Sequence, residues 1–195
     1  MKQEKEDNIV KSRAARDPEG RRMAIVAACA DLIVEEGIRK VTNRRVAERA
    51  NVPLGSTTQY FKSVDALRYA GLEELANRAD EAYQEIIEQM DASTLNVETY
   101  AEALITYLAD PQRVQADAEL YAAAINDMHV RELAVRAHAS FIRACAPYLD
   151  ETRLEMLMAF ADGALLQTCL YGKPMAAETI RAAMTMILKE KENNE

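Results

Sequence analysis

A run of small, uncharged polar side chains between residues 55 and 60 is the first candidate for chemistry in this sequence. Ser56, Thr57, Thr58 and Gln59 carry hydroxyl and amide groups that donate and accept hydrogen bonds. In the major groove of DNA, a glutamine can pair bidentately with adenine and a threonine methyl group can contact thymine. The run therefore suits the recognition of base edges. A polar surface helix would have the same composition, and Thr57 could instead point toward the first helix.

The charges around this run are positive, whereas the chain as a whole is acidic. Residues 1–62 carry 13 Lys and Arg against 9 Asp and Glu, and residues 63–195 carry 11 against 23. Within residues 38–62, one acid, Glu48, is outnumbered by six cations, namely Arg39, Lys40, Arg44, Arg45, Arg49 and Lys62. A basic block on an acidic body suits a surface that faces phosphates. A solvated basic face is the plainer alternative.

Other kinds of chemistry have little support. The three cysteines are too few and too scattered for a disulfide framework, and the two histidines lack the i, i+4 spacing of a helical metal site. The motifs GxGxxG, GxxxxGK[ST] and GxSxG do not occur. We therefore expect no catalytic residue, no metal and no cofactor. The cysteines are expected to be small buried side chains, with a redox-sensing thiol as the alternative.

The composition also limits where the chain can reside. No apolar run approaches the roughly 18 residues that a membrane span requires. The first twenty residues lack the apolar core of a secretory signal. We therefore expect a protein of the reducing cytoplasm with no membrane partner.

The elements that position the polar run are predicted to be helices. Six glycines and five prolines are about half the usual share, which favours long helices over a sandwich or a barrel. Proline and capping residues divide the chain into helices at about 18–36, 42–49, 54–61, 63–90, 96–109, 110–128, 130–146, 151–171 and 174–191. The fold class is therefore all-α.

Residues 42–61 read as two short helices joined by a tight turn. Thr42 can cap the first helix, and Asn51 tolerates the left-handed conformation that such a turn requires. Pro53 directs Val52 into an extended conformation before the second helix begins. Helix-turn-helix packing leaves one face of the second helix exposed. We expect that face to be Ser56, Thr57, Thr58 and Gln59.

At this point the sequence resembles a known family. The stretch Arg21–Leu67, in particular GIRKVTNRRVAERANVPLGSTTQYFKSVDAL, is similar to the N-terminal domain of tetracycline-repressor (TetR) family transcription regulators. The residues that match that family's signature are Gly37, Thr42, Ala47, Gly55, Ser56, Tyr60, Phe61 and Lys62. Three positions depart from it: Asn51 replaces a glycine, Pro53-Leu54 replaces a polar entry into the helix, and Thr58 stands where a tyrosine is frequent.

The resemblance implies roles for individual residues in DNA binding. Thr42, Asn43, Tyr60 and Lys62 would bind phosphates, and Arg44 would reach a base or a phosphate. The candidate DNA-binding set is Thr42, Asn43, Arg44, Arg45, Gly55, Ser56, Thr57, Thr58, Gln59, Tyr60 and Lys62. If guanine is read bidentately, Arg44 or Arg45 is the expected reader. The basic arm before Arg21 would enter a minor groove or form a flexible tail.

The resemblance also implies the domain organisation and the homodimer. We expect a flexible basic arm at 1–17, a helix-turn-helix domain at 18–63, and a helical domain for effector binding and dimerisation at 64–195. The last two helices would pair with those of a second copy through a low-relief stripe: Leu154, Met158, Ala161, Leu165 and Thr168, with Gly163 allowing close approach. Burial of this stripe in the chain's own core is the alternative. A two-fold dimer predicts a near-palindromic DNA operator.

A small-molecule effector is the last partner that the resemblance implies. The helices from 64 to 150 would surround its pocket, with apolar and tyrosine side chains as the lining. The candidate ligand-binding residues are Tyr83, Met90, Tyr100, Leu104, Tyr107, Tyr121, Ile125, Met128, Phe141, Cys145, Phe160 and Gln167, with Met156 and Asn126 as further candidates. Ordinary core packing is the alternative for each of them.

The implied function is a ligand-responsive, DNA-binding transcription regulator, expected to be a repressor. Two alternatives stay open. One is an architectural DNA binder without an effector. The other is an α-helical enzyme or small-molecule binding module with an accessory N-terminal domain.

Overall fold

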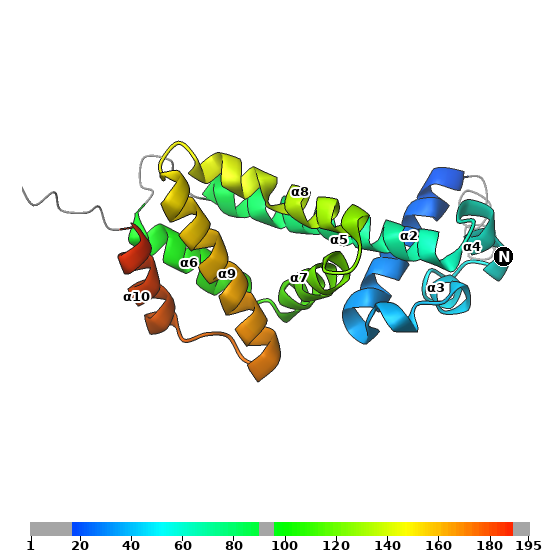
Figure 1. Cartoon of the computed structure of the whole chain (residues 1–195). Coiled ribbons are helices and arrows are strands. Elements are labelled where there is room, and N and C mark those ends of the chain that lie inside the picture. The colour runs from blue at the N-terminus through cyan, green and yellow to red at the C-terminus, as the bar shows by residue number, and fades with distance from the viewer. Residues whose placement is uncertain (1–16, 90–95, 189–195) are drawn as a thin grey trace, which may run out of the picture. The chain divides into compact units, whose positions relative to one another are not determined.

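The structure is a computed structural model that describes residues 17–89 and 96–188. Within these ranges the chain is helical and contains no strand, which confirms the all-α class (Figure 1). The helices are α2 (Pro18–Glu36), α3 (Asn43–Arg49), α4 (Leu54–Tyr60), α5 (Val64–Gln89), α6 (Val97–Leu108), α7 (Pro111–Ala124), α8 (Met128–Cys145), α9 (Glu151–Tyr171) and α10 (Ala177–Leu188), with a 3₁₀ turn at Ile38–Lys40. The chain divides into two compact units, with the boundary between Glu74 and Leu75. The domain boundary at residue 63 stays a prediction.

The first unit begins and turns at the residues that the sequence indicated. The Asp17 carboxylate accepts a hydrogen bond from the Gly20 backbone N–H at 2.9 Å and caps α2, with proline in its first turn. Gly37 ends α2 at a φ of 84°, and Asn51 adopts a φ of 52° in the turn between α3 and α4. These positive φ angles suit glycine and asparagine. The tight turn predicted between the two short helices is confirmed.

The core of the first unit is apolar and closely packed. Ile25, Ile33, Val46 and Leu67 are fully buried. Gly71 lies in α5 where a Cβ atom would be 2.7 Å from the Cys29 sulfur, so a side chain at this position would overlap its neighbours. The Cys29 thiol donates to the Leu67 carbonyl at 3.3 Å, and burial raises its pKa to about 12. Cys29 is therefore an inert core residue.

In the second unit, side-chain caps mark the start of each helix from α6 to α9. Asn96, Asp110, Asp127 and Asp150 each accept hydrogen bonds from backbone N–H groups of the first turn. The cap at Asp127 explains why α7 ends at Ala124 and α8 begins at Met128, a few residues from the predicted bounds. Helix α10 begins three residues after Pro174. The predicted ends at 90 and 191 lie outside the described residues.

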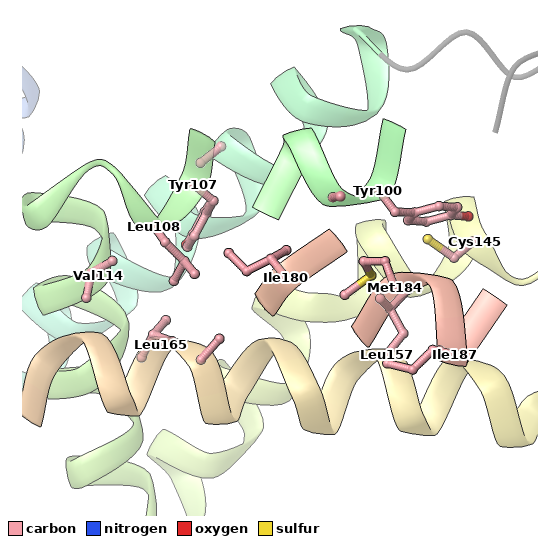
Figure 2. Packing of buried hydrophobic residues seen from close by; sticks show 13 residues of the cluster. Tyr100, Tyr107, Leu108, Val114, Cys145, Leu157, Leu165, Ile180, Met184 and Ile187 are labelled. Carbon is pink, nitrogen blue, oxygen red and sulfur yellow. The ribbon is translucent and has the colours of Figure 1, made fainter. Parts of the chain in front are cut away.

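The core of the second unit lies where α10 packs against α6 and α9. In Figure 2, Ile180 and Met184 of α10 occupy the space between α6 and α9, near Leu157 and Leu165 of α9. Both α9 residues are buried in this chain. Among the described residues, no helix combines the length and the apolar character that crossing a membrane requires.

Candidate DNA-binding surface and effector cavity

Helix α4 has a buried side and an exposed side, and the division differs from the prediction. Ser56 and Thr57 are buried, with exposed fractions of 6% and 0%. The Thr57 hydroxyl donates to the Leu54 carbonyl at 2.8 Å, so this side chain can be buried without losing a hydrogen bond. The expectation of an exposed side chain is therefore wrong for Ser56, and the burial of Thr57 fits the alternative that it points inward. Short hydroxyl side chains occupied the inward positions, which polarity alone did not reveal.

The exposed side of α4 consists of Leu54, Gly55, Thr58 and Gln59. These positions share one helical face because they are spaced three or four residues apart. Thr58 donates its hydroxyl to the Gly55 carbonyl at 3.1 Å, whereas the space around a Cβ at Gly55 is open. Leu54 is the residue that the polar pattern missed. An apolar side chain on this face can contact a thymine methyl group.

Two of the arginines near α4 have structural partners. Arg45 pairs with Glu36, and its guanidinium also donates to the Lys40 carbonyl at 3.3 Å. Arg49 pairs with Glu35 and lies 3.9 Å from Asp31. These ion pairs join α3 to α2, and the hydrogen bonds from the guanidinium groups lower the pKa of Glu35 and Glu36. The charge count over residues 38–62 missed this because the acids lie just before that window.

The other cations are placed differently. Arg44 donates to the Glu48 carboxylate at 2.8 Å, with both side chains largely exposed. Arg39, Lys40 and Lys62 are exposed. Ion pairs at the surface contribute little stability, so Arg44 can exchange Glu48 for a phosphate or a base at low cost. These four cations are exposed within the segment of residues 38–62 that contains α3 and α4.

The remaining candidates lie at the two ends of the motif. The Thr42 hydroxyl oxygen accepts from the Arg45 backbone N–H at 3.3 Å and caps α3. Asn43 is half-buried, with an amide oxygen that is buried and has no hydrogen-bond partner. Tyr60 is half-buried at the end of α4. The roles of these residues toward phosphate stay predictions.

The second unit contains a cavity of about 50 Å³ between α5, α6, α8 and α9. Its lining is mostly apolar and consists of Tyr83, Tyr100, Ala103, Leu104, Tyr107, Leu108, Phe141, Leu157, Met158, Ala161, Asp162 and Leu165. The rings of Tyr83 and Tyr107 stack at 5.3 Å with an interplanar angle of 6°, and Phe141 lies 5.8 Å from Tyr83. The Tyr100 hydroxyl is buried beside the Cys145 thiol.

A polar network lies against this cavity. The Tyr107 hydroxyl donates to Asp117 Oδ2 at 2.5 Å, and the Tyr121 hydroxyl donates to Asp162 Oδ1 at 3.0 Å. Tyr121 Oη also lies 2.5 Å from His138 Nε2. Burial raises the pKa of Asp117 to about 6 and lowers the pKa of His138. The network is therefore acidic near neutral pH, because His138 is uncharged there.

The structure brings five of the predicted ligand-binding residues together and separates the others. Tyr83, Tyr100, Leu104, Tyr107 and Phe141 line the cavity. Cys145 is buried and Phe160 half-buried in the surrounding core, and Tyr121 acts through Asp162. The other predicted lining residues are exposed to solvent, so their assignment to the pocket is wrong: Ile125, Asn126, Met128, Met156 and Gln167. Met90 lies outside the described residues. Sequence reasoning missed Asp162 and Asp117, because acids on a helix usually indicate its solvated face.

The predicted dimer stripe is also placed differently. Leu165 and Thr168 are buried in this chain, while Met158 and Ala161 line the cavity. The stripe is therefore wrong as an outer face. The exposed apolar side of α9 carries Met156, Ala159, Leu166 and Leu170 instead, with Gly163 between them. Leu170 is 80% exposed, and Met186 on α10 is 75% exposed.

Comparison with known proteins shows which solved structures this chain is similar to. No family model matches the sequence, and no curated protein matches it. Among solved structures, SCO1917 from Streptomyces coelicolor A3, a TetR family member, has a TM-score of 0.75 and 28% sequence identity, covering 87% of this chain and 99% of its own. The multidrug binding protein EbrR in complex with imidazole has a TM-score of 0.73 and 28% identity, covering 90% and 93%. With the helix-turn-helix geometry of α3 and α4, these similarities over most of the chain support a TetR family transcriptional regulator.

Proposed function

We propose that the protein is a homodimeric repressor that binds a near-palindromic operator through α4 and is released by a small molecule. The observation that carries this proposal is the exposed face of α4. It presents Gln59, Thr58 and the open space at Gly55 beside the exposed cations Lys62 and Arg44. Amide and hydroxyl groups can read base edges, while the cations hold the helix against the phosphates.

A second copy of the chain is part of this proposal. Large apolar side chains on α9 and α10 are exposed, in particular Leu170 and Met186. Exposed apolar residues on one helix face are typical of an interface. A two-fold axis would give two α4 helices for two half-sites roughly 34–36 Å apart, which is one turn of DNA.

Two exposed positions test the dimer. Leu170→Glu combined with Met186→Glu should convert the protein to monomers, because two charges would have to be buried in the interface. The measurement is the mass in solution by light scattering after size-exclusion chromatography. Val135→Glu on α8 is the control, since Val135 is 66% exposed on another helix. A dimer that survives the double substitution would contradict this interface.

The effector is proposed to bind in the cavity of the second unit. EbrR is described as a multidrug binding protein and is known in complexes with proflavin and ethidium. Pockets for drug-sized ligands usually measure about 300–1,000 Å³, so the cavity of about 50 Å³ must enlarge around such a molecule. A ligand that fits only the enlarged form would shift the population toward it. We infer that this form binds the operator weakly.

Selection of bound fragments from the source genome tests the function as a whole. The enriched fragments should share a near-palindromic sequence, and the substrate or product of an enzyme encoded by a neighbouring gene should release them. Absence of enrichment would overturn the proposal. Enrichment that no ligand reverses would favour the architectural DNA binder. We infer a regulator rather than an enzyme, and a cytoplasmic location because its partner is the operator.

A further inference from the structure

We infer that the cavity of the second unit binds a flat aromatic organic cation, with the carboxylate of Asp162 as its counter-ion. This inference deepens the proposed function and rests on it in one respect, namely that the cavity is the effector site. Asp162 is half-buried on α9, the helix that also buries Leu157, Ala164 and Leu165. Its carboxylate is the charged group of an otherwise apolar and tyrosine lining.

The charges around Asp162 are not balanced within the described part of the chain. Asp162 accepts a hydrogen bond from Tyr121 on α7, and Asp117 on the same helix accepts one from Tyr107 of α6. No Lys or Arg among the described residues forms an ion pair with either acid. From α8, His138 faces the network, and burial keeps its imidazole neutral near pH 7. From α5, the uncharged Tyr83 faces it.

Two neighbouring carboxylates without a cation favour a ligand that brings one. Removing an acid from water is costly unless a positive charge or hydrogen bonds compensate it. Tyrosine hydroxyls supply the hydrogen bonds here but no charge. An anionic ligand would meet Asp162 without any cation to offset the repulsion. A neutral ligand would displace water from the Asp162 carboxylate without supplying a positive charge to compensate for it.

The aromatic side chains define the shape of the ligand. Tyr83 and Tyr107 form a stacked aromatic pair in the cavity lining, and Phe141 lies beside Tyr83. Aromatic faces attract cations within about 6 Å of the ring centre, and flat aromatic ligands stack on such faces. A flat delocalised cation can therefore use the rings and the carboxylate at once. A compact inorganic cation would leave most of the apolar lining unused.

A matched pair of tricyclic probes tests this inference on the full-length protein without DNA. 9-Aminoacridine is a cation at pH 8, whereas acridine has the same ring system and is neutral at that pH. We expect 9-aminoacridine to bind more than about tenfold tighter than acridine, as judged by fluorescence titration. Asp162→Asn should remove that preference by weakening the cation about tenfold or more while changing acridine by less than about threefold.

Two further variants make the result specific. Asp162→Glu keeps the charge and should recover most of the preference. Glu155→Gln removes an exposed carboxylate from the same helix and should leave both affinities unchanged. The amide introduced by Asp162→Asn can still accept the Tyr121 hydrogen bond, so thermal melting should show a folded protein.

Three outcomes would overturn the inference: equal binding of the two probes, an equal loss of both in Asp162→Asn, or no binding of either probe at millimolar concentration. Failure of the proposed function is seen separately, as loss of duplex binding by the unliganded protein. A protein that binds its operator and is released by neutral compounds alone would keep the function and refute the cation.

Discussion

The two units of this protein differ in where their polar recognition groups lie. In one unit these groups are exposed to solvent, and in the other they are in the interior. In the first unit the core is apolar, and the groups that can recognise a partner, such as Gln59 and Lys62, lie in solvent. In the second unit the groups with recognition chemistry lie inside, where Asp117 is 3% exposed and Asp162 borders a cavity. The difference follows from the partners, because a duplex is larger than the domain that reads it, whereas a small molecule can be enclosed.

This placement has opposite consequences for stability. Polar groups that stay in solvent cost the first unit little stability. The second unit keeps Asp117 in an apolar environment, and this burial raises the pKa of its carboxyl group. Groups that destabilise a fold and are nevertheless present indicate a binding role.

Replacing the buried acid Asp117 should show most clearly how much a buried carboxylate lowers the free energy of unfolding. Burial raises the folded-state pKa of Asp117 from 3.8 to about 6, so its contribution to stability is full below about pH 4 and is lost as the pH rises through about 6. An asparagine side chain at this position cannot ionise. The stability of Asp117→Asn relative to the natural protein should therefore rise by about 3 kcal/mol between pH 3.5 and pH 8.

Urea denaturation at several pH values measures this difference. The matched control is Glu155→Gln, which removes an exposed carboxylate and should show a much smaller pH dependence. If the difference in stability between Asp117→Asn and the natural protein stays constant across this pH range, the pKa of Asp117 is not raised in the folded state.

Two glycines allow the interior and the surface of the first unit to be compared by the same substitution, glycine to alanine. A methyl group at Gly71 would lie 2.7 Å from the Cys29 sulfur and 2.9 Å from the Ile33 side chain, so Gly71→Ala should destabilise the protein by about 1–3 kcal/mol. Gly55 has open space around it, so Gly55→Ala should leave stability unchanged or slightly higher. It should weaken DNA binding instead, because the methyl group would lie between α4 and the duplex. Thermal melts and duplex titrations of the two variants should show these opposite patterns.

The exposed amide of α4 should carry sequence preference. Gln59→Ala should cost about 1–3 kcal/mol on the selected operator and relax one base position in each half-site. Fluorescence anisotropy with single-substitution operators measures both effects. Gln112→Ala, at an exposed glutamine of α7, is the control. An equal loss on every sequence would assign Gln59 to the phosphates rather than to a base.

The smallest expected effect belongs to the exposed lysine after α4. Lys62→Ala should weaken binding to all duplexes alike and lower the slope of log affinity against log salt by about 1. Lys173→Ala removes an exposed lysine of the second unit and should leave the slope unchanged. A change of sequence preference in Lys62→Ala would contradict its assignment to the backbone.

Helix bounds and the turn were predictable because local chemistry determines them. Asp17, Thr42 and Asn96 cap helices through their own side chains, and Asn51 takes the left-handed conformation by itself. Such signals require no knowledge of the tertiary fold. The boundary before α8 moved because Asp127 caps that helix, and α10 begins three residues later than predicted.

Which face of a helix points inward was less predictable, because it depends on distant partners. Ser56 and Thr57 have the same polarity as Thr58, yet they are buried. The apolar stripe that contains Met158 and Leu165 could have faced a second copy of the chain, but these residues line the chain's own cavity. Asp162 carried no signal in the sequence, since its role depends on the tertiary contact with Tyr121.

Titration of the natural protein onto a fluorescent duplex at low salt tests the central claim most directly, with the fragment selected from the genome as the duplex and a scrambled sequence as its competitor. The account predicts tight binding that prefers the selected sequence and weakens steeply as salt is added. It would be contradicted by a protein that ignores both duplexes at low salt, or that binds them equally whether or not Gln59 is present.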